Sequence, residues 1–507
     1  MDWYLGIDLG TSSVKCAAVN QAGDLLDISS RPYPAETDQP AWKTQNPEDI
    51  YQGMVLAVRD LLDQGDLQAG DCRGASIGCA LHGLLALDGA EQPLTPVYTW
   101  ADDRADPQAA DVKGTAEELE LYRITGCPAH GMYPLYKILW LRENRPEVLL
   151  GAERLVSVKE YLFARLTGEY LVDPSLASGS GLLDIHRLAW HPGALDRAGI
   201  TDDLLSPLAD PRQSRPLKDG GFRNRTGFSP GLPLILGSSD AVNSTLGAGA
   251  VLPGQATCMI GSSGAYRMIS PQPRLSPGPS TWCYGLDQDH WLVGGALNNG
   301  GLALSWLKES LRVPGWDTGE LGFDELVGLA EQAEPGCRGL FCLPLFAGER
   351  SPGWNLQARG VFFGLGIDHD LRHLARAVLE GIAYRLRTLD DALEGLTGEI
   401  REVRASGGFT RSPFWSQLTS DVLGRPLDLP ADGDTSARGS AFWALLADRP
   451  SLTLADFGNM VEVTTAFHPR PELSALYQRG YRLHRELSEA ADPLFTSLAA
   501  FRRDLSA

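Results

Sequence analysis

The chain has 507 residues, 64 of them acidic and 44 basic, so its formal net charge at pH 7 is −20. Hydrophobic residues make up 43% and charged residues 21%, a globular composition with enough chain for a sizeable core. Nucleic acids and anionic membranes bind to positively charged protein surfaces. Because this chain has an excess of acidic residues, we expect neither as a partner.

Eight cysteines are scattered along the chain without a C-x-x-C pair. This spacing fits neither a disulfide framework nor a zinc site, and it predicts buried free thiols in a reducing compartment. The first residues show no signal peptide, so we expect a soluble, cytoplasmic protein without a membrane span. None of the lysines follows a glycine, which excludes a Walker-type nucleotide site.

The first half of the chain predicts short strands interrupted by helices. Strands are expected at residues 3–9, 14–20, 25–30 and 73–80. Asn46, followed by Pro47 and two acidic residues, is typical of a helix start, and this helix should run to about Gly65. Further helices are expected at residues 135–144 and 158–166.

A similar pattern starts again near residue 233. Strands are expected at residues 234–236, 256–260, 266–270 and 400–405, and a helix at 414–423. The strand, small-residue turn and strand at 256–270 are similar to those at 3–20, which indicates a diverged internal duplication. We therefore predict one α/β lobe in each half, at residues 1–250 and 251–507.

Two turns carry the residue types that bind phosphate. Asp8 ends an expected strand beside the turn at residues 10–13, where backbone N–H groups and hydroxyls can cradle a phosphate while the carboxylate holds Mg²⁺ through water. An ordinary hairpin turn is the alternative. The turn at 261–264 has the same character and the same place in the second half, which favours two hairpins that hold one nucleotide across a cleft.

Two further positions suggest chemistry. Asp240 follows a Gly-Ser-Ser turn and could act as the general base of phosphoryl transfer, although a helix N-cap is the commoner role for such an aspartate. Gly407 and Gly408 follow an expected strand, where paired glycines let a flat ligand approach the backbone. A plain strand-to-helix turn is the alternative there.

Together these residues resemble the FGGY family of carbohydrate kinases, within the actin/hexokinase-like ATPase superfamily. The resemblance runs from about residue 3 to about residue 447. Residues 132–144 fit the first signature of the family, and residues 360–365 with 373–380 fit the second. The resemblance implies an α/β fold of two actin-like (ribonuclease H-like) lobes with an ATP and sugar cleft between them.

The resemblance also implies roles for single residues. Asp8 would hold Mg²⁺ through water and Asp240 would be the catalytic base, whereas Lys137 and Trp140 are interpreted as packing and capping residues. The expected sugar contacts are His82, Trp100, Asp102, Arg104, His130 and Asp240. The expected contacts to ATP are Thr11, Ser12, Ser13, Lys15, Ser262, Ser263, Gly300, Gly301, Gly407, Gly408, Ser412 and Gln417.

The implied function is ATP- and Mg²⁺-dependent phosphorylation of a sugar or sugar acid. Local likeness to the gluconokinase branch favours gluconate as acceptor, giving 6-phosphogluconate, although Gly131 stands where that branch commonly has proline. An aldonate needs a nearby cation, and Arg104, His82 and His130 are the candidates. Conversion of D-xylulose to xylulose 5-phosphate, another FGGY sugar or polyol kinase, or a non-catalytic sugar-sensing regulator are the alternatives. The oligomeric state stays open, with a homodimer as one option.

Overall fold

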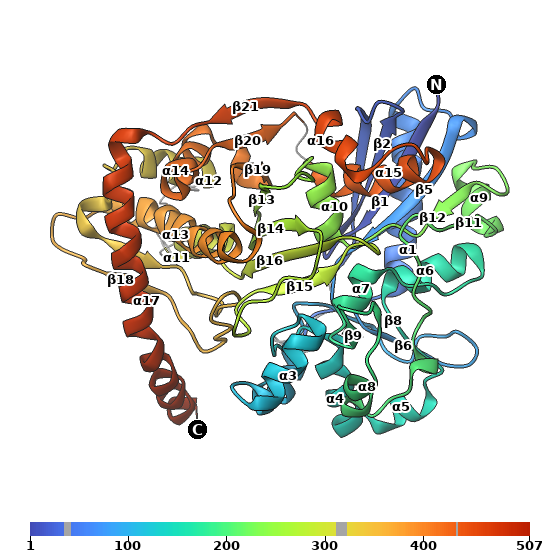
Figure 1. Ribbon diagram of the computed structural model, residues 1–507, viewed down its shortest axis with the longest axis horizontal. Coiled ribbons are helices and arrows are strands. Elements are labelled where there is room, and N and C mark those ends of the chain that lie inside the picture. The colour runs from blue at the N-terminus through green and yellow to red at the C-terminus, as the bar shows by residue number, and fades with distance from the viewer. Residues whose placement is uncertain (35–41, 311–321, 432–433, 507) are drawn as a thin grey trace, which may run out of the picture. The chain divides into compact units, whose positions relative to one another are not determined.

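The computed structural model describes residues 1–34, 42–310, 322–431 and 434–506, in which helices and strands alternate along the chain (Figure 1). The chain divides into two compact units. The first comprises Met1–Pro253, Ile269–Val293 and Asp434–Val461, and the second Gly254–Met268, Gly294–Gly433 and Glu462–Ala507. Each unit contains a β-sheet and helices, so the fold is α/β with two sheet-containing units, as predicted. The lobe boundary near residue 250 stays a prediction.

The sheet of the first unit has six strands in the order β11-β12-β5-β1-β2-β3. Their bounds are β1 Trp3–Leu9, β2 Ser13–Asn20, β3 Leu25–Pro32, β5 Cys72–Cys79, β11 Ser214–Pro216 and β12 Pro233–Ile235. The central strand β1 is buried along its whole length, and it pairs antiparallel with β2 and parallel with β5. The predicted strands of this half are therefore confirmed to within two residues.

The helices of the first unit begin where the sequence places capping residues. Asn46 caps α1, and its side chain accepts a hydrogen bond from the Glu48 N–H at 2.9 Å. The other predicted helices are also present, as α4 and α6. The bounds of the helices that the argument uses are α1 Pro47–Gln64, α4 Pro134–Asn144, α5 Pro146–Gly151, α6 Val158–Thr167, α10 Asp240–Gly247 and α15 Thr435–Asp448.

Glycines allow the backbone of α15 to contact the backbones of β1 and α10. A Cβ atom at Gly439 would lie 1.8 Å from the Asn243 carbonyl oxygen, and one at Gly247 would lie 1.8 Å from that of Thr435. A Cβ atom at Gly6, within β1, would lie 2.1 Å from the Ala437 carbonyl oxygen. No side chain fits at these three places, so α15 packs directly against β1 at Gly6, and against α10 at Gly439 and at Gly247, the last residue of α10.

The sheet that contains most strands of the second unit repeats this arrangement. Its order is β15-β16-β14-β13-β19-β20-β21. Strand β13 pairs antiparallel with β14 and parallel with β19, just as β1 pairs with β2 and β5. This repetition supports the internal duplication. The bounds are β13 Gln255–Ile260, β14 Gly264–Ser270, β15 Trp282–Gly285, β16 Trp291–Leu297, β19 Glu402–Ser406, β20 Leu427–Pro430 and β21 Val463–Phe467.

Five α-helices and a hairpin complete the described part of the second unit (Figure 1). The hairpin consists of β17 and β18, which pair antiparallel. The predicted helix at 414–423 is present as α14. The bounds are α11 Gly301–Ser310, α12 Phe323–Glu331, α13 Leu371–Thr397, α14 Pro413–Leu423, α17 Pro471–Ser506, β17 Phe341–Leu343 and β18 Val361–Phe363.

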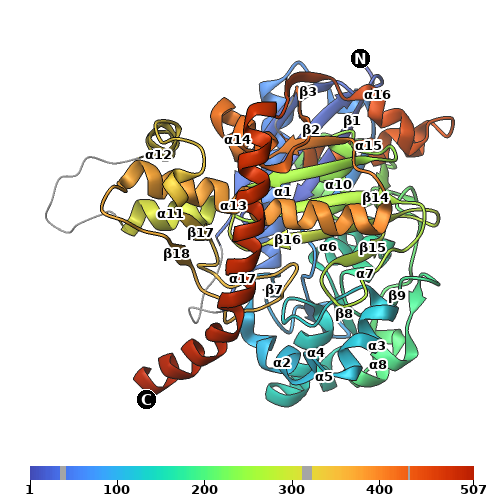
Figure 2. The same ribbon diagram turned by 60° about the vertical axis from the view of Figure 1, so that its left-hand side comes forward.

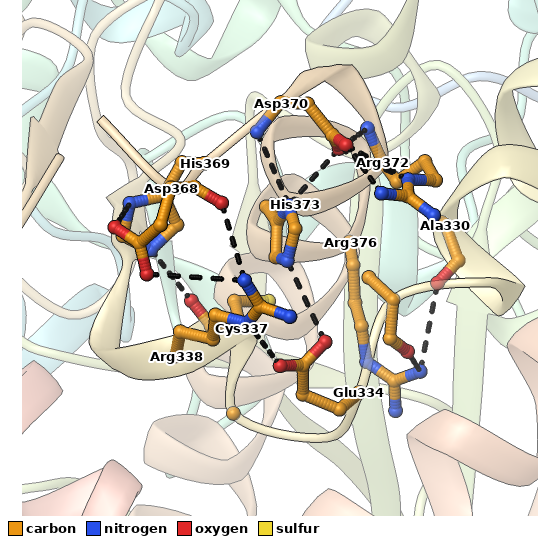
Figure 3. Close-up of polar contacts among 12 residues, drawn as sticks. Ala330, Glu334, Cys337, Arg338, Asp368, His369, Asp370, Arg372, His373 and Arg376 are labelled. Atoms are coloured by element: carbon orange, nitrogen blue, oxygen red, sulfur yellow. Dashed lines mark hydrogen bonds and ion pairs between the residues drawn. The ribbon is translucent and has the colours of Figure 1, made fainter. Parts of the chain in front are cut away.

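The second signature segment forms the start of α13, where ion pairs fasten the helix to its surroundings (Figure 3). Asp370 caps the helix, and the His373 ring lies between the carboxylates of Asp370 and Glu334, at 3.0 and 3.5 Å. Farther along, the Arg376 guanidinium donates to Glu380 at 2.9 Å. These residues fasten one helix terminus, which is a structural task.

All eight cysteines are buried free thiols, as predicted. Within the described part of the chain, no helix combines the length and the apolar character needed to cross a membrane. The cytoplasmic location stays a prediction.

The close approach of α15 and α10 is open to a direct test. We expect Gly439→Ala to lower the free energy of unfolding by about 2 kcal/mol or more, because the added methyl group overlaps the Asn243 carbonyl oxygen. Gly395→Ala in α13 is the matched control: a Cβ atom there meets nothing within 4 Å, so the variant should be neutral or up to about 1 kcal/mol more stable. Urea unfolding would measure both, and equal effects would contradict the packing described.

Candidate active site

Three aspartates of the first unit converge at the end of β1. Asp8 is the last residue but one of β1, Asp240 is the first residue of α10, and Asp434 precedes α15 and caps it. Asp240 is not the N-cap of its helix. Ser239 takes that place and accepts a hydrogen bond from the Val242 N–H at 3.3 Å. The alternative interpretation of Asp240 as a capping residue therefore does not hold.

Asp8 is the buried member of the three, and it feels the negative charges of the other two. Burial, and then the negative charges of Asp240 and Asp434, raise the pKa of Asp8 to about 7. Lys15 offsets part of this charge, since its ammonium lies 2.7 Å from the Asp434 carboxylate. Burial works against the charged form of Lys15, but the attraction of Asp434 prevails and the lysine pKa is raised.

The cluster has the chemistry of a site for a hydrated cation. Oδ1 of Asp8 is buried and makes no hydrogen bond with any described residue. Carboxylate oxygens are the ligands that Mg²⁺ prefers, often through its own water molecules. Over residues 1–34, 42–310, 322–431 and 434–506, no three acidic, histidine or cysteine side chains are placed to hold a metal ion directly. Binding of Mg²⁺ through water at Asp8 stays a prediction.

The turn after Asp8 is braced by hydrogen bonds from neighbouring segments. The Gly10 N–H donates to the Ser13 carbonyl at 3.0 Å, and the Tyr33 N–H donates to the Ser12 carbonyl at 3.1 Å. The indole N–H of Trp100 donates to the Thr11 hydroxyl at 2.9 Å. Trp100, an expected sugar contact, is thus joined directly to an expected phosphate contact.

His82 follows β5 in a left-handed backbone conformation, with φ of 69°. Its Nδ1 lies 2.7 Å from the Gly179 carbonyl oxygen, and its ring lies edge-on to Tyr133 and Tyr284 at centroid distances of 4.9 and 5.9 Å. The two tyrosine hydroxyls are hydrogen-bonded to each other at 3.0 Å. Sequence analysis did not single out either tyrosine, although Tyr133 lies within the first signature segment.

Arg104 and Asp102 form a buried pair. The guanidinium donates from Nε and from one terminal nitrogen to the two carboxylate oxygens, at 2.6 and 2.9 Å. It also lies over the rings of Tyr98 and Trp42, at 3.7 and 4.4 Å. The sequence had suggested Arg104 as the cation for an aldonate carboxylate. In the structure its charge is already balanced by Asp102, and the pair shapes the loop that carries Trp100.

Lys137 of the first signature is fully buried and joins two segments of the site. Its ammonium donates to the carbonyl oxygens of His82 and Thr99, both at 2.7 Å, and lies 3.4 Å from that of Tyr98. Burial lowers the pKa of this lysine to about 7. Lys137 therefore holds the backbone at His82 against the backbone before Trp100, which agrees with its predicted capping role.

His130 and Gly131 form a tight turn before α4. Nδ1 of His130 accepts a hydrogen bond from the Met132 N–H at 3.1 Å. A Cβ atom at Gly131 would lie 2.2 Å from a carboxylate oxygen of Asp106 and 2.7 Å from the Asp106 nitrogen. Only glycine fits there. The departure from proline at this position reflects close packing against Asp106.

The second unit brings most of the expected nucleotide contacts together. The N–H groups of Gly300 and Gly301 donate to the carbonyls of Ser262 and Gly261, at 3.0 and 2.7 Å, so this loop lies directly on the turn after β13. Gly407 has φ of 99°, and a Cβ atom there would lie 2.5 Å from the Ile260 carbonyl oxygen. These turns therefore form one cluster with little side-chain bulk, which consists of residues 261–263, 300–301 and 407.

The remaining expected contacts have roles within the protein. The Ser412 hydroxyl caps α14 by accepting from the Trp415 N–H at 3.2 Å, and Gly408 begins the short helical turn before it. The Gln417 amide donates to Asp421 and to the His468 carbonyl, both at 2.9 Å. Asn299 is not among the expected contacts to ATP, yet its amide bonds to the backbone of Ala347 and Gly348, both at 2.9 Å, and anchors the glycine loop.

The carboxylate cluster predicts an unusual effect of pH on stability. Because the folded state holds the proton of Asp8 more tightly than the unfolded state, the aspartate lowers stability as pH rises from about 4 to about 7. We expect Asp8→Asn, in the presence of a chelator, to raise the free energy of unfolding by about 2–4 kcal/mol near pH 8, and by much less near pH 5.

Asp203→Asn, at an exposed site of the first unit, is the matched control for the loss of one negative charge and should change little. Thermal unfolding at both pH values would measure the effect. An Asp8→Asn variant that is equally destabilised at both would show that the buried charge is not costly.

Comparison with known proteins places the chain in a family. Residues 3–247 match the N-terminal domain of the FGGY family of carbohydrate kinases, and residues 256–447 match its C-terminal domain. A gluconokinase of Bacillus licheniformis is 34% identical, over 99% of both chains. A xylulose kinase of Escherichia coli (strain K12) is 29% identical, over 97% of this chain and 99% of the relative.

Solved structures agree with the sequence matches. A gluconate kinase from Lactobacillus acidophilus superimposes with a TM-score of 0.91 and 30% identity, covering 98% of this chain and 99% of the other. A ligand-bound xylulose kinase from the same organism gives a TM-score of 0.92 and 30% identity, over 98% and 100%. With both domains of the family matched in order, the chain belongs to the FGGY family of carbohydrate kinases and is a carbohydrate kinase.

Proposed function

We propose that this kinase transfers the γ-phosphoryl group of ATP to gluconate and forms 6-phosphogluconate. The higher identity to a gluconokinase than to a xylulose kinase, over nearly the whole chain in both cases, carries the choice of acceptor. D-Xylulose is the second candidate, because structures of both kinases superimpose almost equally well. The retained Asp8 and Asp240 argue against a non-catalytic sugar-sensing regulator.

Kinases of this family use ATP, generally with Mg²⁺. We assign Mg²⁺ to the carboxylates at the end of β1, with Asp8 holding it through water, because one oxygen of Asp8 lacks a hydrogen-bond partner among the described residues. When bound, Mg²⁺ neutralises phosphate charge. In the first unit Thr11, Ser12, Ser13 and Lys15 would meet phosphates. In the second, the turn at Ser262 and Ser263 and the glycines at 300–301 and 407–408 would do so, with Ser412 and Gln417 nearby.

Asp240 is proposed to accept the proton of the attacking alcohol as the phosphoryl group moves. Its place suits a carboxylate base, because Asp240 lies at the N-terminus of α10 and its carboxylate accepts a hydrogen bond from the Ala241 N–H at 2.8 Å. Lys15 is paired with Asp434 and so does not neutralise Asp240. In the same unit, His82, Trp100 and His130 would orient the sugar, on backbone segments that Lys137 and the Arg104–Asp102 pair hold in place.

The base assignment predicts a selective loss of turnover. Asp240→Asn should lower kcat by about 100-fold or more and leave the KM for ATP nearly unchanged, since it removes proton transfer and little else. Asp203→Asn, which removes the same charge from an exposed site, should keep normal kinetics. Steady-state ADP release would measure both variants. An Asp240→Asn enzyme with near-normal kcat would exclude Asp240 as the base.

The acceptor assignment predicts a higher kcat/KM for gluconate than for D-xylulose. An ADP-release screen against aldonates, pentuloses, hexuloses and polyols would rank the acceptors. A higher value for xylulose would refute gluconate without affecting the kinase assignment. No turnover with any of them would favour the regulator instead.

The variant Arg104→Met tests whether Arg104 binds the carboxylate of an anionic sugar or only maintains the loop that carries Trp100. Because Asp102 already balances Arg104, we expect the variant to raise KM for gluconate and xylulose by similar factors, through loss of loop geometry. A rise in KM for gluconate alone would show instead that Arg104 contacts the substrate carboxylate. Arg212→Met is a suitable control, since Arg212 forms a similar pair with Asp210 on the exposed surface of the same unit.

A further inference from the structure

A small cavity in the second unit is lined by more positive than negative charge. The charged residues of its described lining are two arginines, Arg350 and Arg385, and one glutamate, Glu349. All three are buried, with at most 8% of each residue exposed. The cavity has room for about one water-sized particle. None of the described residues that line it is a proposed contact to ATP, so it is separate from the nucleotide turns.

Arg385 of α13 lines this cavity and has a donor without an acceptor. Its Nε is buried and makes no hydrogen bond with any described residue. One terminal nitrogen of the same guanidinium donates to the Glu349 carboxylate and, at 3.1 Å, to the Ser351 carbonyl. A buried N–H group that lacks an acceptor costs free energy. An acceptor for Nε of Arg385 must therefore come from outside the described chain.

The surroundings of Arg385 also disfavour its positive charge. Burial lowers the pKa of Arg385 to about 10. Helix α17 crosses α13 (Figures 1 and 2), and the His484 ring of α17 contacts that of Tyr384 with 5.2 Å between the centroids. Burial, and then the charge of Arg385, lower the pKa of His484 to about 3, so this ring is neutral at pH 7. A second negative charge beside Arg385 would stabilise the guanidinium.

We propose that the cavity binds one monoatomic anion, chloride, with Nε of Arg385 as its hydrogen-bond donor and Arg350 as the second positive charge. A chloride ion supplies the missing acceptor and a negative charge in one particle. A water molecule would supply the acceptor alone. Phosphate and carboxylate groups have the right charge but exceed the space. Metal cations are repelled by the two arginines.

The lining of this cavity also anchors the glycine loop at 300–301. The Arg350 guanidinium donates to the Leu297 carbonyl at 2.9 Å, at the end of β16. Two residues farther along, the Asn299 amide donates to the Gly348 carbonyl at 2.9 Å. Because these contacts join the start of the loop to the segment that carries Arg350, a bound chloride ion stabilises the second unit where the loop is attached.

Thermal unfolding of the full chain in potassium chloride, balanced with potassium isethionate to constant ionic strength, tests the proposal. We expect the apparent Tm to rise by about 2–4 °C up to about 200 mM chloride and then level off, as a site with Kd of about 10 mM saturates. Arg385→Met should abolish this rise. Arg387→Met is the matched control in the same helix, because Arg387 donates to the Val422 carbonyl at 2.9 Å and does not line the cavity.

The arginine control should keep the full rise in Tm. A Tm that does not depend on chloride would overturn the proposal, and so would a rise that survives Arg385→Met.

Glu349→Gln tests the sign of the charge and does not depend on the arginine variant folding. Because Glu349 repels an anion and competes with it for Arg385, its neutralisation should lower the chloride concentration at half-effect by about 3–10-fold. An unchanged or higher half-effect concentration would contradict an anion in this cavity.

Bromide locates the ion in crystals of the unaltered protein. Anomalous scattering from crystals grown in bromide should show a peak within about 3.5 Å of Nε of Arg385. A cavity that is empty or holds only water under these conditions would refute the site. Bromide in the cavity without a chloride effect on Tm would mark an adventitious ion only, and would overturn the proposal as well.

Discussion

The contact of α15 with β1 and α10 is the constraint on which the catalytic region of the first unit depends. Glycines at positions 6, 247 and 439 allow the backbones of these three elements to contact one another. Asp8 lies near the end of β1, and Asp240 and Asp434 lie at the starts of α10 and α15. Because Asp8, Asp240 and Asp434 belong to elements that cannot move apart without breaking this contact, their mutual repulsion is built into the fold. The packing of these elements thus keeps the three carboxylates close together, although their electrostatic repulsion favours separation.

Three cations of the first unit are already engaged by other groups of the protein. Lys15 is committed to Asp434, Arg104 to Asp102, and Lys137 to backbone carbonyls. None of these three cations is available to bind a ligand. The carboxylates at the end of β1 keep an excess of negative charge, which Lys15 offsets only in part. A cation that arrives with the nucleotide would relieve this excess. The buried carboxylate of Asp8 costs stability when it is ionised, which is common where stability is given up for function.

Local patterns predicted the elements well, because strands, turns and caps are encoded by neighbouring residues. The hairpin at 3–20, the cap at Asn46 and the helix at 134–144 needed no knowledge of the rest of the chain. The arrangement of side chains was harder to predict. The pairing of Arg104 with Asp102 removes a cation that the sequence presents as available, and the hydroxyl contact between Tyr133 and Tyr284 joins residues 151 positions apart. Asp434 is not among the expected site residues, since nothing near it in sequence shows that α15 returns to the first unit.

The two signature segments show why resemblance to a motif does not by itself identify a reacting group. In the first, the Lys137 ammonium donates to the backbone carbonyls of His82 and Thr99, in two segments that carry expected sugar contacts. In the second, His373 contacts Glu334 and Asp370 at the start of α13 (Figure 3), and Glu380 pairs with Arg376 within the same helix. Both segments act by fixing the course of the backbone, and the groups proposed to react or to bind ligands lie on the turns. A substitution in a signature should therefore affect folding and ligand geometry together, whereas a substitution of Asp240 should affect the chemical step alone.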